Sequence, residues 1–385
     1  MISVEQAWDH LIDHALPRAS ELISVREANG RQLAKPVKAL ISKPQVNQSS
    51  MDGYAVRLQD VCEPDATLNV VGEVRAGEAP SITLQKNEAV RIFTGASLPS
   101  GADHILIQET VSRDGDTITY DRADEQPRWV RQEGLDFSAG DILVDAGTRL
   151  DWRHIALISS ANITHIEVFR APHVAIITNG DELRPPGSNL EPHQTVDALG
   201  PALEALLKSC GCTVSHHGPL PDDTEAVRQA LSAIDADFFV PVGGASVGDY
   251  DHMQDAFAAL GFEPIFSKVA VRPGKPSWFS RRDNACVMGL PGNPVSALVC
   301  AQLFLKPLLT AQRPVLRRLP LEADLLAEGP REHFRRGTWT EIGVSSFPDQ
   351  DSSRLGLLAN ADVLIRRIAD APAAKSGEFV EAILI

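Results

Sequence analysis

The sequence predicts a multidomain α/β protein in which a doubly wound, mostly parallel sheet has β-rich segments before and after it. Strand and amphipathic-helix patterns alternate four times between residues 171 and 311, as is typical of parallel strands joined by crossover helices. Short β-like runs broken by Gly, Pro and Asp occupy residues 20–150 and the chain after Pro314. A chain of 385 residues is also too long for one ordinary core, so roughly two to four folding units are expected.

The N-terminal part begins with a helix, for which Ser3 and Gln6 form a capping box. Apolar residues recur on one face of this helix: Val4, Ala7, Trp8, Leu11 and Ile12. The strands expected next have the sequences ATLNVVGEV, AVRIFTG, HILIQETV and DTITYD. A short helix is expected over Trp152–Ala161, where Asp151 is the N-cap.

The central part contains four strands, each paired with a helix. The expected strands have the sequences HVAIITNG, CTVSHHG, DFFVPVGG and NACVMGLPG. The expected helices have the sequences TVDALGPALEALLKSC, DTEAVRQALSAI, YDHMQDAFAAL and PVSALVCAQLFLKPLL. The chain ends in an apolar strand, EFVEAILI.

Composition excludes several classes of function. The net charge of −15 argues against general nucleic-acid binding, because the phosphate backbone would be repelled. No stretch is apolar for the roughly 18 to 20 residues that cross a bilayer, and the acidic N-terminus is unlike a signal peptide. We therefore expect a cytoplasmic protein without a membrane partner. The five scattered cysteines fit reduced thiols rather than a disulfide framework.

Ligands of open α/β sheets bind outside the carboxyl ends of the strands, and three strand ends carry unusual loops here: residues 178–182, 243–251 and 290–294. Glycines let backbone N–H groups approach an anion, and a following helix N-terminus adds partial positive charge. The candidate binding residues in these loops are Gly180, Asp181, Gly243, Gly244, Ser246, Gly248, Pro291, Gly292, Asn293 and Pro294. A single loop of this kind is common in α/β proteins.

The second loop also matches the nucleophile elbow G-x-S-x-G around Ser246. A serine hydrolase at Ser246 is therefore an alternative. It lacks a suitable downstream histidine, because His252 is too close in sequence and His333 lies in the next domain.

Three cations cluster in the segment KVAVRPGKP. Strand alternation places Lys268 and Arg272 on one face, and the Pro273-Gly274 turn brings Lys275 towards them. Such a group suits an oxyanion or a pyrophosphate. The alternative is a solvated edge strand whose charges prevent aggregation.

Carboxylates provide a candidate magnesium site. Mg²⁺ takes oxygen ligands and shares substrate phosphates, and the acids considered are Asp52, Asp136, Glu182, Asp222 and Asp251. Asp52 lies in the sequence SMDGYA, where Asp-Gly alone could simply mark a turn. Cys210, Cys212, His216 and His217 do not have common zinc spacing and are interpreted as structural.

The motifs S-x-MDGYA, RIFTGASLPSGADHILIQE, GDEL, GG-x-SVGDYD, KVA-x-x-PGKP and GLPGNPVSA follow one another over about 250 residues. In this order they resemble the molybdopterin molybdenumtransferases, a family that includes the E domain of gephyrin. The resemblance covers nearly the whole chain. It implies an elongated linker domain (1–44 and 141–170), an inserted β-rich domain (45–140), a molybdopterin-binding α/β domain (171–311) and a C-terminal β-barrel (312–385).

The resemblance also implies the reaction. Adenylylated molybdopterin, made by an upstream adenylyltransferase, and molybdate give molybdenum cofactor and AMP. It implies a homodimer whose active site is shared between subunits. Its functional residues fall on Asp52, Thr94, Asp136, Glu182, Asp222, Asp251, Lys268, Pro291 and Pro294. The metal ligands would be Glu182, Asp251 and Asp52, while Lys268, Arg272 and Lys275 would neutralise oxyanions.

Some positions depart from the family pattern. Asn179 stands where Thr or Ser is usual, Arg272 where Lys is usual, and Ala198-Leu199 where a polar pair follows Asp197. These departures leave a second hypothesis beside the magnesium-dependent transferase: a non-catalytic relative that binds the cofactor or acts as a scaffold.

Overall fold

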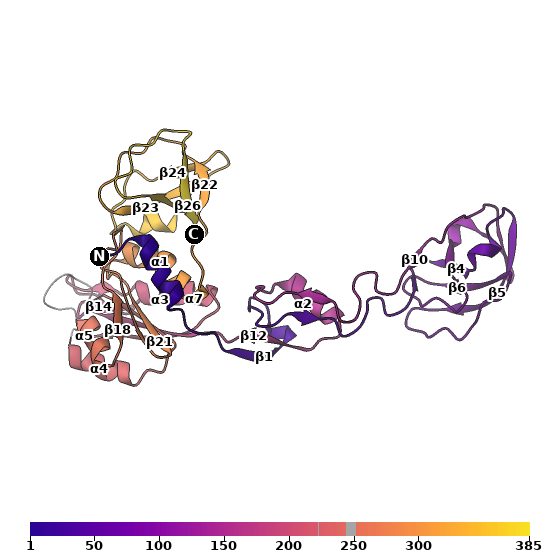
Figure 1. Ribbon diagram of the computed structural model, residues 1–385, viewed down its shortest axis with the longest axis horizontal. Coiled ribbons are helices and arrows are strands. Elements are labelled where there is room, and N and C mark those ends of the chain that lie inside the picture. Colours follow the sequence, from indigo (N-terminus) through magenta and orange to yellow (C-terminus); the bar gives the residue numbers. More distant parts are fainter. Residues whose placement is uncertain (222, 244–251) are drawn as a thin grey trace. The chain divides into compact units, whose positions relative to one another are not determined.

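The computed structural model describes residues 1–221, 223–243 and 252–385. Its contacts divide the chain into two compact units (Figure 1). Unit 1 comprises Met1–Arg18 and Ala171–Ile385, and unit 2 comprises Ala19–Arg170.

Unit 2 contains a small part built from both ends of its sequence. Its elements are β1 (Ser20–Ser24), β2 (Val37–Lys38), β11 (Ile142–Val144), α2 (Trp152–Ser160) and β12 (His165–Phe169). β1 pairs antiparallel with β12, and β2 with β11. Asp151 caps α2 as expected, since its side chain accepts from the N–H groups of Arg153 and His154. Leu33, Ile158 and Val168 contribute to the core of this part.

The segment between those ends forms a six-stranded sheet of order β7-β4-β6-β5-β9-β8. Its strands are β4 (Gly53–Val56), β5 (Ala66–Val74), β6 (Glu88–Ile92), β7 (His104–Ile107), β8 (Ser112–Asp114) and β9 (Thr117–Tyr120). β3 (Gln48–Ser49), which precedes the DGYA turn in sequence, pairs antiparallel with β10 (Val130–Arg131). Three 3₁₀ turns complete unit 2: η1 (Val25–Glu27), η2 (Leu58–Asp60) and η3 (Gln108–Thr110).

Unit 1 contains the predicted α/β sheet, of order β16-β13-β17-β21-β20-β18. Its strands are β13 (His173–Asn179), β16 (Thr213–Leu220), β17 (Phe238–Val242), β18 (Glu263–Phe266), β20 (Trp278–Arg282) and β21 (Ala285–Gly289). The first four in this order are parallel to one another, whereas β20 pairs antiparallel with β21 and β18 pairs antiparallel with β20. The mostly parallel sheet is therefore confirmed, with an antiparallel edge that the sequence patterns did not reveal.

Helices cover both faces of this sheet. They are α3 (Leu199–Ser209), α4 (Thr224–Ser232), α5 (His252–Ala259), α6 (Pro294–Cys300) and α7 (Lys306–Thr310). Alternate residues of β13 enter two different cores, Val174 and Ile176 with α3 and α6, and Ala175 and Ile177 with α4 and α5. A π-helical turn, η4 (Ala301–Leu305), joins α6 to α7. This two-sided packing is the doubly wound arrangement.

The first helix, α1 (Val4–Asp13), has the expected capping box of Ser3 and Gln6. Its buried face belongs to the same core as α3 and α6, and the indole N–H of Trp8 donates to the Leu303 carbonyl at 2.7 Å. α1 is thus part of unit 1, whereas the expected boundary grouped it with the linker domain.

The C-terminal sheet has the order β19-β23-β25-β26-β22, and β24 also pairs with β23. Its strands are β19 (Val271–Arg272), β22 (Arg317–Pro320), β23 (Glu332–Trp339), β24 (Val344–Ser346), β25 (Val363–Arg367) and β26 (Phe379–Leu384). A bridge between Leu321 and Val344 connects the β22 end to β24 and closes a small barrel. The short helix α8 (Leu355–Ala359) precedes β25.

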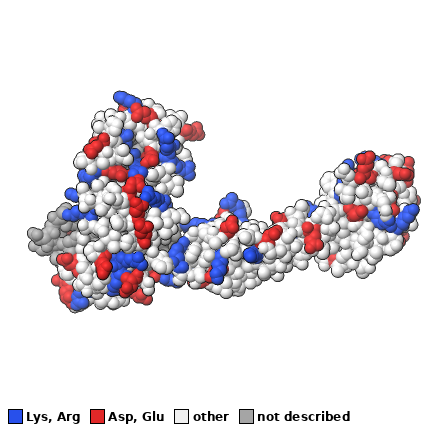
Figure 2. Space-filling view, in the orientation of Figure 1, with Lys and Arg blue, Asp and Glu red and all other residues white. Residues whose placement is uncertain are grey.

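Charges of both signs are mixed on the visible face of unit 1, where blue and red side chains lie among one another (Figure 2). The net charge of −15 therefore does not produce a uniformly acidic face there. All five cysteines are free thiols, as expected. Within the described residues, no helix is both long and apolar enough to cross a membrane.

Candidate active site

The three predicted loops follow neighbouring strands, because β17 lies between β13 and β21. A Cβ placed on Gly243 would lie 2.9 Å from Asn179 Oδ1, and one on Gly292 would lie 3.3 Å from the Gly243 Cα. Gly243 also has a φ of +100°, a conformation that side chains disfavour. The described starts of the loops are therefore packed against one another, and the half-buried Gly243 leaves no room for a side chain.

The first loop turns sharply at Gly180, which has a φ of +143°. The Leu183 N–H donates to the Gly180 carbonyl at 3.0 Å and closes the turn. A Cβ on Gly180 would lie 2.8 Å from Glu182 Oε2, so the exposed Glu182 carboxylate folds back over the glycine. Asp181 is also exposed. Both acids are accessible from solvent at the carboxyl edge of β13.

The third loop leads into α6. Asn293 caps this helix, with its Oδ1 accepting from the Ser296 N–H at 3.4 Å, and Pro294 occupies the first helical turn. The Asn293 side chain thus has a helix-capping role. Pro291 is buried and Gly292 exposed, so Gly292 presents the backbone of this loop to solvent.

A polar cluster lies next to the first loop in the chain; two of its members, Thr178 and Asp197, are buried, and the third, His216, is partly exposed. Thr178 Oγ1 donates to Asp197 Oδ2 at 2.9 Å and lies 3.1 Å from His216 Nε2. Asp197 Oδ1 accepts from the N–H groups of Leu199 and Gly200 at 3.1 and 3.0 Å. Burial alone would raise the pKa of Asp197, but the hydrogen bonds from His216, Gly200 and Thr178 outweigh it and lower this pKa to about 2.

The sequence patterns did not single out this cluster as a unit. Asp197 precedes the helix by two residues, which is a common signal for side-chain capping of a helix start. Its partners could not be found this way, since Thr178 and His216 come from two other strands. A Cβ on Gly200 would lie 2.2 Å from the His216 ring, so the absence of a side chain at Gly200 makes room for the imidazole.

The departure at Ala198-Leu199 has a structural consequence. Leu199 is only 6% exposed and belongs to the core of the α/β domain. It therefore offers a ligand neither a polar group nor an accessible surface.

The three predicted cations lie on a segment that alternates as expected. Val269 and Val271 are buried, Lys268 is half-buried, and Arg272 and Lys275 are exposed. In the described part of the chain, no acid forms an ion pair with any of the three cations. Their charge is available for an anion.

The segment pairs with the C-terminal sheet rather than with the α/β sheet, because β19 runs parallel to β23 and Arg272 lies opposite His333. The Pro273-Gly274 turn packs on α6, where a Cβ on Gly274 would lie 2.0 Å from Cys300 Sγ. Cys300 ends the helix that begins at Pro294. At 1.5 Å per residue, the turn is about 9 Å along α6 from the third loop.

Arg272 also lines a pocket of about 480 Å³, together with His333, Arg335, Pro348, Gln350 and two acids, Asp349 and Asp351. Burial lowers the pKa of His333 to about 4, so this imidazole is neutral at pH 7. Its Nδ1 is 2.9 Å from Glu328, which also accepts from Arg335 at 3.1 Å. Arg335 is thus paired with Glu328, whereas Arg272 forms no ion pair within the described residues.

Asp52 lies in unit 2, in the turn before β4. Its Oδ1 accepts from both the N–H and the hydroxyl of Thr94, each at 2.8 Å. These bonds hold the pKa of Asp52 below its usual value, and the charge of Arg91 lowers this pKa further. The Asp52 carboxylate is therefore ionised at neutral pH, and Oδ2 is not used by Thr94.

Arg91 stabilises this turn. Its guanidinium lies 5.1 Å from the ring centroids of both Tyr54 and Phe93 and donates to the Gly53 carbonyl at 3.1 Å and to Gln108. The sequence patterns did not identify Arg91 as a site residue. Its only sequence signal was its position in RIFTG, the strand paired with the DGYA strand.

Asp136 is exposed in unit 2, with its carboxylate 3.7 Å from Lys43 Nζ. The remaining predicted site residues, Asp222, Gly244, Ser246, Gly248 and Asp251, lie outside the described residues. The hydrolase hypothesis depends on Ser246 and therefore also concerns residues outside the described ones.

Comparison with known proteins covers the whole chain. Residues 2–162 match the family model of the MoeA N-terminal region, domains I and II. Residues 175–311 match the probable molybdopterin binding domain, and residues 318–385 the MoeA C-terminal region, domain IV. A molybdopterin molybdenumtransferase of Nostoc sp. is 35% identical over 83% of this chain and 77% of its own length. The chain belongs to the molybdopterin molybdenumtransferase family.

Other members of the molybdopterin molybdenumtransferase family support the same assignment. The molybdopterin molybdenumtransferase of Haemophilus influenzae is 34% identical over 80% of this chain and 77% of its own length. The crystal structure of a molybdopterin biosynthesis MoeA protein from Pyrococcus horikoshii matches with a TM-score of 0.89 at 29% identity, covering 100% of this chain and 99% of that one. The predicted fold class is confirmed.

Proposed function

We propose that this protein inserts molybdenum into adenylylated molybdopterin and releases molybdenum cofactor and AMP. The observation that carries the proposal is the match of three family models, in order, to residues 2–162, 175–311 and 318–385. The close packing of Asn179, Gly243 and Gly292 supports it, since it brings three strand-end loops to one edge of the sheet.

The loops would bind the phosphoanhydride of the pterin nucleotide. Backbone N–H groups can approach phosphate oxygens closely only where no side chain intervenes. Gly292 is exposed in the third loop, whereas the N–H groups of Gly180 and Gly243 donate to the Leu220 and Leu290 carbonyls and would shape the loops rather than bind the phosphate. Holding the nucleotide in this fixed position aligns the bond that breaks when AMP leaves.

The free cations would bind molybdate. Arg272 presents a planar fork and Lys275 a compact charge, and both are exposed without an ion pair in the described part of the chain. A tetrahedral dianion can share both.

Magnesium is part of this proposal, with Glu182, Asp251 and Asp52 as its ligands. Among the described residues, no three His, Cys, Asp or Glu side chains converge on one point. The proposed set therefore requires Asp251, which lies outside those residues, and Asp52 of unit 2. The donor chemistry fits, because Glu182 is exposed and Asp52 is ionised with one oxygen not bound to Thr94. When bound, the cation would neutralise charge on the phosphoanhydride oxygens.

A homodimer with shared sites is a further part of the proposal: Asp52 and Thr94, in unit 2 of one subunit, would complete the site at the strand-end loops in unit 1 of its partner. Mixing inactive Asp52→Asn with inactive Glu182→Gln tests it. Random exchange of subunits should restore about a quarter of the wild-type sites, because half of the dimers are mixed and each holds one complete site. If the mixture stays inactive while exchange is shown to occur, the shared site is wrong.

A second candidate is a carrier that binds the nucleotide without cleaving it. The burial of Leu199, where the family usually has a polar residue, favours this alternative. Calorimetry with adenylylated molybdopterin, followed by analysis of AMP, separates the two functions. Release of AMP that depends on molybdate supports the transferase. Tight binding that leaves the nucleotide intact supports the carrier.

A further inference from the structure

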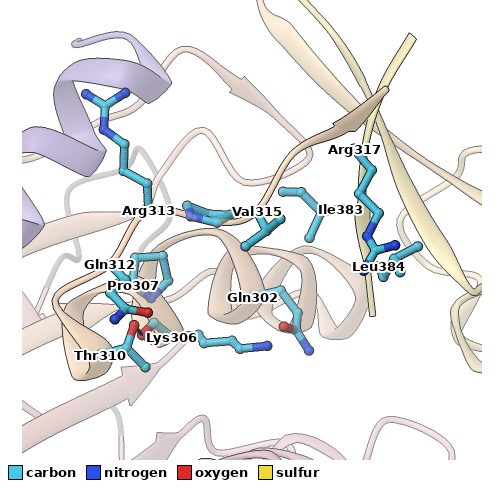
Figure 3. A pocket seen from close by; sticks show the side chains of 11 residues that line it. Gln302, Lys306, Pro307, Thr310, Gln312, Arg313, Val315, Arg317, Ile383 and Leu384 are labelled. Carbon is cyan, nitrogen blue, oxygen red and sulfur yellow. Dashed lines mark hydrogen bonds between the residues drawn. The ribbon is translucent and has the colours of Figure 1, made fainter. Parts of the chain in front are cut away.

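A second pocket lies where the chain passes from the α/β domain to the C-terminal sheet (Figure 3). It has a volume of about 270 Å³ and is bordered by the helical segment 302–310, the crossing residues 312–315, and β22 with β26. This pocket is distinct from the one beside Arg272, because the two have no lining residue in common. Ligand pockets are common at such domain junctions.

The described residues that line this pocket include three cations and no acid. Arg313 is already neutralised, by Glu5 at 2.6 Å and by Asp9, and its side chain points away towards α1 in Figure 3. Lys306 and Arg317 are different. Neither forms an ion pair within the described part of the chain, so two positive charges remain at the pocket.

The rest of the lining is apolar or neutral. Val315, 74% exposed, stands beside Ile383, and Leu384 lies next to the end of Arg317 (Figure 3). Figure 3 shows Lys306 extending along the helix towards Gln302, whose amide can also donate a hydrogen bond. The pocket thus combines cationic and amide donors with an apolar wall that water solvates poorly.

We propose that this pocket binds a small organic anion with one anionic head group and a ring-sized apolar body. Lys306, which ends beside Gln302, and Arg317, which ends beside Leu384 (Figure 3), would attract the head group, a carboxylate or a phosphate, from two sides of the pocket. Val315 and Leu384 would cover the apolar body. A ligand here would contact both sides of the domain junction. The proposal does not depend on the transferase function.

Titration calorimetry of the full-length chain tests this proposal with phenyl phosphate, benzoate and inorganic phosphate. We expect at least one aromatic anion to bind, and a preference for benzoate or for phenyl phosphate identifies the head group. Lys306→Gln and Arg317→Gln should each weaken this binding about tenfold, as expected for loss of one charge-assisted bond. Val315→Ser should reduce the advantage of phenyl phosphate over inorganic phosphate.

Arg318→Gln is the matched control. Arg318 is the next residue on β22, does not line the pocket, and lies over the Phe379 ring at 5.8 Å. Its substitution should leave binding within about twofold of wild type. The proposal is overturned if neither aromatic anion binds, if Lys306→Gln and Arg317→Gln bind like wild type, or if Arg318→Gln weakens binding as much as they do.

Discussion

Asp52 and Thr94 are joined by two hydrogen bonds to a single carboxylate oxygen, one from the backbone N–H and one from the hydroxyl, each at 2.8 Å. The two residues are separated by 42 positions in the sequence. Their contact fixes the orientation of the DGYA turn and leaves Oδ2 of Asp52 for a metal or a substrate. Thr94 is therefore a positioning residue, because it acts by orienting the Asp52 carboxylate.

Thr94→Val should raise the pKa of Asp52, because the hydroxyl bond that stabilises its carboxylate is lost. Asp52 must be ionised to bind a cation, so the acidic limb of the rate–pH profile of AMP release should move to higher pH. Thr94→Ser keeps the hydroxyl and should retain the wild-type profile. An unchanged profile for Thr94→Val would show that this bond does not control Asp52.

Gly243→Ala should disrupt the convergence of the strand-end loops. The added methyl would lie 2.9 Å from Asn179 Oδ1 at a φ of +100°, and we expect a loss of about 1–3 kcal/mol in stability together with loss of AMP release. Gly187→Ala is the control, since Gly187 has a φ of +90° but no atom within 4 Å of the added methyl. Comparable damage from both variants would mean that backbone strain, not crowding of the loops, is responsible.

Asp197→Asn should make the stability of the α/β domain less dependent on pH. The folded-state pKa of Asp197, about 2, lies below the unfolded value of about 3.9. Its charge therefore stabilises the fold fully above about pH 5, by about 2 kcal/mol, and this contribution disappears as the pH falls through about 2. Hydrogen exchange of the β13 amides, measured at neutral and acidic pH, reports this domain separately. If Asp197→Asn exchanges like wild type at pH 7, the cluster does not stabilise the sheet; Asp181→Asn, at an exposed acid, is the comparison.

Arg272→Gln and Lys275→Gln should weaken the use of molybdate. Each removes one charge that no acid neutralises in the described residues, so the KM for molybdate should rise about tenfold. The KM for the pterin nucleotide should change much less. Lys86→Gln makes the same charge change at an exposed position of unit 2 and controls for net charge. Equal effects on both substrates would contradict a molybdate role.

Local signals in the sequence were sufficient for individual elements. Ser3 and Gln6 predict the start of α1, and Asp151 that of α2, because a cap acts within three or four residues. The edge of the sheet where a ligand binds was also predictable. Alternating strands and helices indicate parallel strands, so Gly180 and Gly243, which each follow a strand, lie at the same edge.

Pairing between distant segments could not be read from local patterns. Val271 and Arg272 belong to the C-terminal sheet because of their pairing with Glu332 and His333, some 60 positions later. The antiparallel edge strands β18 and β20 carry no helix between them that would mark a crossover. Whether the predicted acids and cations act together depends likewise on how distant parts of the protein, or two subunits, come together. Their catalytic roles stay predictions.

Chemical analysis of the reaction product is the most direct test of the account. The purified protein would be given adenylylated molybdopterin, molybdate and Mg²⁺, and molybdenum in the pterin fraction would be measured by mass spectrometry beside AMP. We predict equal amounts of pterin-bound molybdenum and AMP, both lost in Glu182→Gln. Molybdenum-free pterin with the AMP group still attached would contradict the proposed function.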